Sequence, residues 1–324
     1  MKPTYDVLCI GAGPTGLACA IEAVRAGLRP LVMDKGCLCN SLCHYPVNMV
    51  FFTTPELLEI GDLPMTCAGE KPTRSEALRY YRRAAEHFGL ETRLYERVVK
   101  VEGNNQEFQI LTHGAGDEVH SYAGRKIIVA TGYYDLPNLL GVPGEDLSHV
   151  SHYYTEAHPC WGQDVVVVGG QNSAAEAALD LFRAGARVTV VHRGKELGRS
   201  IKYWVRPDVE NRIKAGEIRA LFKTRVTEIG TGSVTVEGSM WRKERLAARQ
   251  VFLLTGYHPD FEFLQSLGVS LDAETKKPQM NPDTFESNVP GIYLAGVVVG
   301  GLQTNEIFIE NGRFHGKQIV AGIK

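Results

Sequence analysis

Three glycines near the start of the chain have a spacing that suits phosphate binding. Residues 7–10 form a short apolar run, Gly11, Gly13 and Gly16 follow it, and a helix-like stretch begins at Leu17. Gly11 permits a tight turn, Gly13 lets the backbone approach a pyrophosphate, and Gly16 lets the helix pack on the strand. The N–H groups that open the helix then point at the anion. This pattern predicts a strand, a glycine turn and a helix that bind a dinucleotide.

An acidic residue at the end of the next strand supports this interpretation. The apolar residues 31–33 lead into Asp34, at the distance from Gly11 where an acid accepts hydrogen bonds from an adenosine ribose. The other interpretation of Asp34 is a solvated strand end. The predicted contacts of this first site are Gly11, Gly13, Pro14, Thr15, Gly16, Asp34 and Lys35.

The same order of elements recurs in the middle of the chain. Four valines, residues 165–168, lead into Gly169, a helix to Arg183, and a second strand that ends in His192-Arg193. The motif is degenerate, because Gln171 stands in the middle glycine position. Cations at the end of the second strand suit the extra 2'-phosphate of NADPH, although a solvated basic turn would look the same. The predicted contacts of this second site are Gly169, Gly170, Asn172, Ser173, Ala174, His192, Arg193 and Lys195.

Three further segments end in glycine and indicate how the domains are connected. Residues 127–132 and 251–256 are interpreted as paired strand ends that bracket the central unit, and residues 291–296 as a strand whose glycine end brings backbone N–H groups to the first cofactor. They add Thr131, Gly132, Gly256, Gly296 and Val297 to the predicted cofactor contacts. We therefore predict an α/β fold with two Rossmann-like domains, in which residues 135–250 are inserted between residues 1–134 and 251–324 of the first domain.

Composition excludes several other classes of protein. The 324 residues include 35 basic and 37 acidic side chains, with no basic block, so nucleic-acid and membrane-surface binding are not expected. No apolar run is long enough to cross a bilayer, and the first residues lack the apolar core of a signal peptide. We therefore expect a cytoplasmic protein. Its seven cysteines would be reduced there, and their odd number argues against a disulfide scaffold.

With both sites identified, the order of motifs resembles the low-molecular-weight thioredoxin reductase superfamily over the whole chain. Within it the sequence is similar to the bacillithiol disulfide reductase (YpdA-type) family. Four stretches carry this resemblance: Ala130-Thr131-Gly132-Tyr133-Tyr134, Glu156-Ala157-His158-Pro159, residues 256–264 (GYHPDFEFL) and residues 307–312 (IFIENG). The resemblance implies a thioredoxin reductase-like fold, FAD in the first site, NADPH in the second, and oxidised bacillithiol as the disulfide substrate.

Two departures from these families bear on the chemistry. Thioredoxin reductases carry a CxxC pair in the inserted domain, whereas this region has only Cys160, so reduction of thioredoxin through an internal dithiol is not expected. The YpdA-type glycine motif usually has a cysteine where this sequence has Thr15. If that cysteine attacks the disulfide, Thr15 cannot replace it, because a hydroxyl group does not form a redox-active thiolate at neutral pH.

Three cysteines follow Asp34 in a loop that passes near the flavin in this superfamily. Cys37, Cys39 and Cys43 could supply the attacking thiol, and reduced flavin could then cleave the mixed disulfide or a cysteine pair. Three thiols beside His44 could instead hold a metal, but no fourth ligand has a suitable spacing, and we predict no metal. They could also be small apolar residues that fill the loop. Cys43, Cys37 and Cys39 are the predicted catalytic residues.

The sequence thus predicts an FAD-dependent NADPH oxidoreductase that reduces a small-molecule disulfide, as a homodimer or homotetramer. Two alternatives stay open at this point. Residues 143–149 (PGEDLSH) faintly resemble a segment of the flavin monooxygenases, and Thr15 leaves room for a non-catalytic flavin redox sensor or electron-transfer partner.

Overall fold

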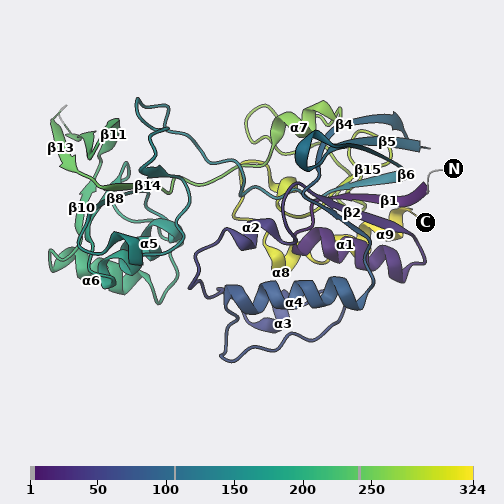
Figure 1. Ribbon diagram of the computed structural model, residues 1–324, viewed down its shortest axis with the longest axis horizontal. Coiled ribbons are helices and arrows are strands. Elements are labelled where there is room, and N and C mark those ends of the chain that lie inside the picture. Colours follow the sequence, from purple (N-terminus) through teal and green to yellow (C-terminus); the bar gives the residue numbers. More distant parts are fainter. Residues whose placement is uncertain (1–3, 106, 240–241, 324) are drawn as a thin grey trace. The chain divides into compact units, whose positions relative to one another are not determined.

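The computed structural model describes residues 4–105, 107–239 and 242–323 (Figure 1). The chain divides into two units. Unit 1 comprises residues 1–44, 49–136 and 257–324, and unit 2 comprises residues 45–48 and 137–256. Of the residues assigned to the first predicted domain, 1–3, 106 and 324 lie outside the described part of the chain.

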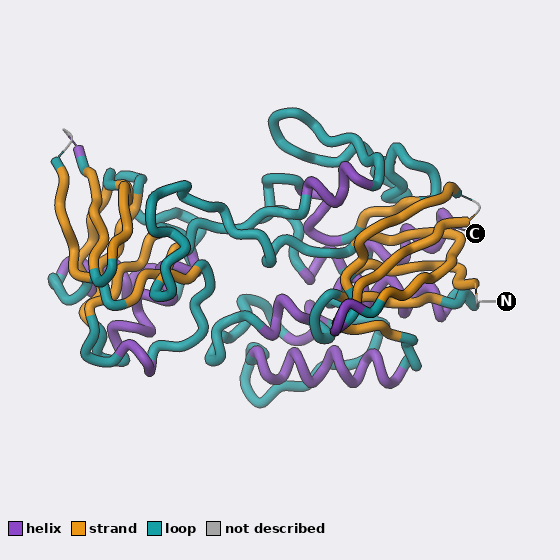
Figure 2. Tube along the Cα trace, turned by 45° about the horizontal axis from the view of Figure 1, so that its top comes forward, coloured by secondary structure: helices purple, strands orange, loops and turns teal. Residues whose placement is uncertain are grey.

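Unit 1 is built on a seven-stranded sheet whose strands appear in orange in Figure 2. The strand order is β3-β2-β1-β6-β5-β4, and β15 pairs with β6 as well. The strand β6 is long enough for three partners, because its first half pairs antiparallel with β5 while its second half lies parallel between β1 and β15. The strands are β1 (Thr4–Ile10), β2 (Pro30–Asp34), β3 (Thr92–Leu94), β4 (Arg97–Asn104), β5 (Glu107–His113), β6 (Val119–Val129) and β15 (Ile292–Leu294).

The parallel strands of unit 1 bring distant segments to one edge of the sheet. The Gly11 N–H donates to the Met33 carbonyl after β1, and the Ala130 N–H donates to the Ile10 carbonyl after β6. Residues 11, 34, 130 and 295 therefore lie where four parallel strands end. In open α/β sheets, ligands bind outside these carboxyl ends.

Helices pack against this sheet, and α1 and α9 lie side by side (Figure 1). Their backbones approach closely, because a Cβ atom at Gly316 of α9 would lie 2.8 Å from the Cα atom of Cys19 in α1. Cys9 of β1 and Cys19 of α1 are fully buried in this core. The helical segments of unit 1 are α1 (Pro14–Arg25), α2 (Asn40–Cys43), α3 (Pro55–Leu58), α4 (Arg74–His87), η1 (Ala115–Asp117), α7 (Phe261–Ser266), η4 (Gly296–Gly300), α8 (Ile309–Gly312) and α9 (His315–Ile323).

Unit 2 has a second, entirely parallel sheet of order β10-β9-β8-β14-β7 and a small antiparallel sheet of order β11-β12-β13. Its strands are β7 (Val150–Ser151), β8 (Asp164–Val168), β9 (Arg187–His192), β10 (Arg219–Phe222), β11 (Arg225–Gly230), β12 (Ser233–Glu237), β13 (Lys243–Ala247) and β14 (Gln250–Leu253). Its helical segments are η2 (His158–Cys160), α5 (Asn172–Arg183) and α6 (Arg206–Lys214).

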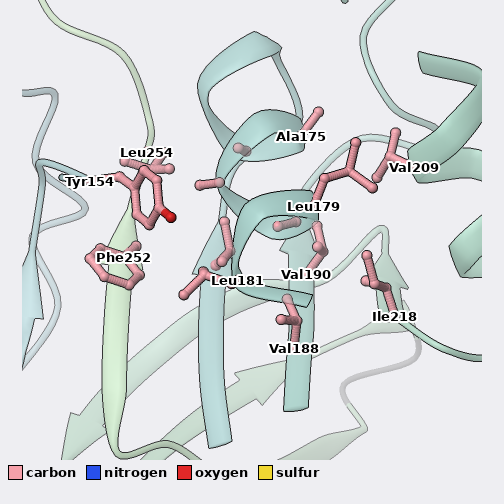
Figure 3. Packing of buried hydrophobic residues seen from close by; sticks show 14 of the residues in the cluster. Tyr154, Ala175, Leu179, Leu181, Val188, Val190, Val209, Ile218, Phe252 and Leu254 are labelled. Carbon is pink, nitrogen blue, oxygen red and sulfur yellow. The ribbon is translucent and has the colours of Figure 1, made fainter. Parts of the chain in front are cut away.

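The four valines of β8 explain the layers of unit 2. Successive side chains of a strand point to opposite faces. Val165 and Val167 join the cluster beneath α5, where Leu179 and Leu181 of that helix lie against the sheet (Figure 3). Val166 and Val168 join a second cluster with residues of the small antiparallel sheet. A valine run buried on both faces is typical of a central parallel strand.

The interpretation of residues 127–132 and 251–256 as paired strand ends was wrong. The strand β6 belongs to the sheet of unit 1, whereas β14 pairs with β7 and β8 in unit 2. The two segments share a local pattern, an apolar strand that ends in glycine. That pattern fixes the strand but not its partner, because pairing depends on contacts far away in the sequence.

Candidate functional site

The first glycine turn is enforced by close backbone contacts. Gly11 has a φ of +111°, and a Cβ atom there would lie 2.3 Å from the Ala130 carbonyl oxygen. A Cβ atom at Gly16 would lie 1.9 Å from the Gly11 carbonyl oxygen. Both distances are far inside van der Waals contact, so the loop closes this tightly only with glycine at both positions.

Gly13 needs a different explanation. Its φ is −76°, which any residue adopts, and a Cβ atom there would meet no protein atom within 4 Å. Gly13 caps the N-terminus of α1 without a side-chain hydrogen bond, so the first N–H groups of that helix face the same open space. This space beside free N–H groups fits a pyrophosphate, since a side chain at residue 13 would fill the approach to those groups.

Asp34 lies at the edge of this space. Its carboxylate accepts hydrogen bonds from the Ala12 N–H and the Gly36 N–H, each at 2.8 Å. Burial raises its pKa, and the two N–H groups act in the opposite direction. Each carboxylate oxygen keeps a further lone pair, so Asp34 can still accept from a ribose hydroxyl. Lys35 next to it forms an ion pair of 2.9 Å with Asp135.

A cavity of unit 1 opens next to Asp34. It extends from the glycine turn to residues of the segments 96–98, 133–136 and 258–263, which the sequence did not indicate as cofactor contacts. The predicted contacts Thr131 and Gly132 form part of its wall. Its lining residues are Ile10, Gly11, Met33, Asp34, Lys35, Glu96, Arg97, Val98, Thr131, Gly132, Tyr133, Asp135, Leu136, His258, Asp260 and Phe263. Residues 258–263 belong to the GYHPDFEFL stretch, which carries part of the family resemblance. The sequence therefore held a signal for these wall residues, although they were not among the predicted cofactor contacts.

A buried histidine holds the turn after β15. Gly296 has a φ of +74°, and its N–H donates to Nδ1 of His315 at 3.1 Å. His315 is 6% exposed, its ring stacks on Phe285 at 4.1 Å between centroids, and burial lowers its pKa to about 4. His315 is therefore neutral at physiological pH. Sequence reasoning missed it, because it lies 19 residues from Gly296 and belongs to no motif.

Thr15 packs on the same turn. Cβ atoms at Gly296 and Gly312 would lie 3.1 and 3.0 Å from the Thr15 hydroxyl oxygen. The half-buried Thr15 side chain thus lies between two glycines from the last part of the chain. Val297, the next residue of η4, is also half-buried.

The second glycine turn keeps its tight corner despite the degenerate motif. Gly169 has a φ of +153°, and a Cβ atom there would lie 2.5 Å from the Leu254 carbonyl oxygen and 2.8 Å from the Cβ atom of Ala174. Ala174 is buried and is small enough for the third position. Gln171 fits the middle position because its side chain turns aside, where its Oε1 accepts a hydrogen bond from the Ser200 hydroxyl at 2.8 Å.

The N-terminus of α5 is anchored by the loop that follows β9. Asn172 donates to the Ser200 carbonyl and accepts from the Lys202 N–H, while Ser173 is exposed. No side chain caps the helix, so its first N–H groups stay available for an anion. Gly256 follows β14, and its carbonyl accepts from the Asn138 N–H.

Three basic residues lie at the end of β9 or just after it, and they differ from one another. The His192 ring packs directly on Gly170, where a Cβ atom would lie 2.3 Å from it. Burial, and then the charge of Arg193, lower the pKa of His192, so the ring is not a cation at neutral pH. Arg193 and Lys195 are exposed, and within the described ranges neither takes part in an ion pair. Both are exposed basic side chains that directly follow β9.

The cysteines after Asp34 also separate into two kinds. Cys39 is 1% exposed, its N–H donates to the Ala12 carbonyl, and burial raises its pKa well above the usual value. Cys37 and Cys43 are partly exposed, and the Cys37 thiol donates to Asn40 Oδ1 at 3.7 Å. Among the residues that the structure covers, no three His, Cys, Asp or Glu side chains are grouped to hold a metal ion. Cys160 is buried in the core of unit 2.

No helix among the described residues is long and apolar enough to cross a membrane.

Comparison with known proteins extends these observations to the whole chain. The pyridine nucleotide-disulphide oxidoreductase family matches residues 8–296. Bacilliredoxin reductase Bdr of Bacillus subtilis (strain 168) is 44% identical over 319 residues, which cover 98% of this chain and 96% of the relative. The structure of bacillithiol disulfide reductase Bdr (YpdA) from Bacillus cereus has a TM-score of 0.96 and 43% identity and covers 99% of both chains.

A thioredoxin reductase from Lactococcus lactis has a TM-score of 0.78 at 23% identity, over 99% of this chain and 98% of that one, and so shares the fold. The predicted family, thioredoxin reductase-like fold, oxidoreductase class and cofactor pair are therefore confirmed. By the length and level of these matches, the chain belongs to the pyridine nucleotide-disulphide oxidoreductase family and, within it, to the bacillithiol disulfide reductase (YpdA-type) group of FAD- and NADPH-dependent enzymes.

Proposed function

We propose that this enzyme passes two electrons from NADPH through FAD to a low-molecular-weight disulfide, with bacillithiol disulfide as the preferred substrate. The observation that carries the proposal is the similarity, over 99% of both chains, to a protein named as a bacillithiol disulfide reductase. The geometry of the two glycine turns supports it, since each offers a helix N-terminus to a pyrophosphate.

In this proposal the first turn holds FAD. The N–H groups at the start of α1 bind the pyrophosphate across Gly13, with Pro14, Thr15 and Gly16 opening the helix. Asp34 accepts from the adenosine ribose, and the cavity beside it, which includes Thr131 and Gly132, takes the adenosine. Gly296 and Val297 line the flavin side, where His315 fixes the backbone of Gly296.

The second turn holds NADPH. Gly169, Gly170 and the N-terminus of α5 face the pyrophosphate, and Arg193 with Lys195 pairs with the 2'-phosphate. The neutral His192 ring acts as a wall against Gly170 rather than as a charge. When bound, NADPH supplies a hydride and FAD relays the two electrons, while the protein binds and orients both groups.

The two alternative functions have less support. In the PGEDLSH stretch, the Glu145 carboxylate accepts from the N–H groups of Leu140, Gly141 and Val142, which gives that residue a structural role in its own loop. A non-catalytic sensor is less favoured because the relatives of matching length carry the names of reductases.

Stopped-flow reoxidation of the NADPH-reduced enzyme tests the proposal. The panel contains bacillithiol disulfide, glutathione disulfide, cystine and an oxidised bacilliredoxin. We expect bacillithiol disulfide to reoxidise the enzyme far faster than the other small disulfides. Faster reoxidation by the oxidised bacilliredoxin would identify a redoxin as the substrate. If no disulfide reoxidises the enzyme faster than oxygen does, the proposed function is refuted.

We also propose that the enzyme is a homodimer or homotetramer of the cytoplasm. Several large apolar side chains of unit 1 are strongly exposed, as expected for a covered surface, and the seven cysteines are free thiols. The exposed side chains include Phe52, Leu57, Phe308 and Phe314. Light scattering of the purified protein measures the oligomer, and a monomeric mass at micromolar concentration would contradict it.

A further inference from the structure

We propose that His258 recognises the adenine of FAD, because its Nε2 atom accepts a hydrogen bond from the 6-amino group of that base. The inference rests on one part of the proposed function, the binding of FAD by the first glycine turn. His258 is not among the predicted cofactor contacts, yet it lines the same cavity as Asp34. Asp34 accepts from the adenosine ribose, so the base joined to that ribose lies in the cavity beside His258.

Two hydrogen bonds hold the backbone of this segment in the cavity wall. The His258 N–H donates to the Leu136 carbonyl at 3.0 Å, which ties the segment after β14 to the segment after β6. Two residues later, the Asp260 carboxylate accepts from the Phe263 N–H at 2.9 Å and caps α7. Leu136, Asp260 and Phe263 all line the cavity, so both anchors belong to its wall.

The imidazole ring of His258 has one nitrogen in use and one available. Its Nδ1 atom lies 2.8 Å from the Pro259 carbonyl oxygen. A carbonyl oxygen only accepts hydrogen bonds, so Nδ1 carries the proton, and in the neutral ring Nε2 is an acceptor. The ring also stacks on Phe261, with 5.5 Å between the centroids and 9° between the planes. The carbonyl contact and the stacking together fix the direction in which Nε2 accepts.

The carboxylates of the same wall already have partners. Asp135 forms the ion pair of 2.9 Å with Lys35, Glu96 accepts from two hydroxyl groups, and Asp260 caps α7. Within residues 4–105, 107–239 and 242–323, the ring of His258 has its hydrogen bond at Nδ1 and none at Nε2. The 6-amino group is the hydrogen-bond donor of adenine. Among the charged and imidazole side chains of the wall, Nε2 of His258 is therefore the acceptor left for it.

This contact makes the first site selective for the base as well as for the ribose and the pyrophosphate. A base that lacks the 6-amino group leaves Nε2 without a donor, and a base with a carbonyl at that position places two acceptors face to face. Sites that hydrogen-bond a ligand group discriminate against analogues without it, because their own polar groups are then unpaired.

Binding of two flavin dinucleotides tests the contact without measuring turnover. One is FAD, and the other carries unsubstituted purine in place of adenine. The full-length protein is stripped of flavin and titrated with each compound by flavin fluorescence at about pH 8, where an ordinary imidazole is neutral. The wild type should bind FAD roughly 3- to 10-fold more tightly, as expected for one hydrogen bond. His258→Phe keeps an aromatic ring for the stack on Phe261 and should bind both compounds within about 2-fold of each other.

Two further variants separate the hydrogen bond from a structural role of the ring. His258→Gln should recover most of the preference for FAD, because its side-chain amide oxygen can accept at the position of Nε2. The control His113→Phe changes an exposed histidine at the end of β5 and should keep the wild-type preference. Equal affinity of the wild type for the two compounds, or an undiminished preference in His258→Phe, would overturn the proposal.

Labelling of the wild type with diethyl pyrocarbonate gives a measurement that needs no variant. The reagent acylates unprotonated imidazole nitrogens, so peptide mass spectrometry should find His258 labelled in the flavin-free protein and protected in the FAD-loaded one. Equal labelling of both forms would overturn the proposal. A protein that binds no FAD would refute both the assignment of the first turn and this contact. A protein that shows the base preference but reduces no disulfide would refute the proposed function and still support the contact.

Discussion

Acidification provides a test of the environment of His315. Its ring is buried, stacks on Phe285, and accepts the Gly296 N–H at Nδ1. Protonation of Nδ1 would remove that acceptor and place a charge in an apolar site. We therefore expect the folded enzyme to resist protonation of His315 and the unfolded chain to accept it readily.

The sign and size of the effect follow from the two pKa values. The folded pKa is about 4, below the ordinary value of 6.5, so His315 contributes stability above pH 6.5 that is lost as the pH falls toward 4. At 1.36 kcal/mol per pKa unit, the full loss below pH 4 is about 3 kcal/mol. Between about pH 7.5 and about pH 5.5 the loss is roughly 1.3 kcal/mol.

Urea unfolding of the FAD-loaded wild type and of His315→Asn at these two pH values isolates this contribution. The asparagine oxygen can accept the Gly296 N–H but does not titrate, so any constant cost of the substitution cancels between the two conditions. Circular dichroism and release of flavin fluorescence follow the unfolding. The wild type should lose roughly 1.3 kcal/mol more than the variant on acidification. Parallel losses, or a wild type that gains stability in acid, would show that His315 is not held neutral by burial.

Three other variants test the two nucleotide sites. Gly13→Val should fold but purify largely without FAD, because its side chain enters the open space at α1, and full flavin absorbance after desalting would contradict this assignment. Gly16→Ala should lower the free energy of unfolding by about 1–3 kcal/mol or more, because its Cβ atom would meet the Gly11 carbonyl, and unchanged urea unfolding would speak against that contact. Arg193→Ala should raise the KM for NADPH by an amount worth about 1–3 kcal/mol with little change for NADH, and equal losses in steady-state assays with both nucleotides would give Arg193 a structural role.

The two nucleotide-binding turns could be predicted from the sequence because their determinants are local. Gly11 and Gly16 are required by contacts within one strand, turn and helix, and the valines of β8 read directly as a strand buried on both faces. The partners of β6 and β14 could not be predicted, because the two strands end in the same local pattern and differ only in tertiary neighbours.

The thiol and histidine contacts depend on geometry that no spacing rule contains. Cys39 adopts a left-handed conformation, which is uncommon for a residue other than glycine, and its side chain is buried. The contact of His315 with Gly296 joins α9 to the turn after β15, which lies 19 residues earlier in the chain. The pattern of residue types places three cysteines in one loop, but it does not show that Cys39 is buried while Cys37 and Cys43 are partly exposed.

The discontinuous sheet of unit 1 has a consequence for synthesis on the ribosome. Residues 137–256 of unit 2 are released as one continuous stretch, and all the strands of its parallel sheet lie within it. Unit 1 completes its fold later, because β15 joins its sheet and α9 packs on α1 only after residues 292–323 have left the ribosome. The part of unit 1 that is synthesised first therefore remains an incomplete sheet while unit 2 folds. The edge of that sheet that binds the flavin forms last.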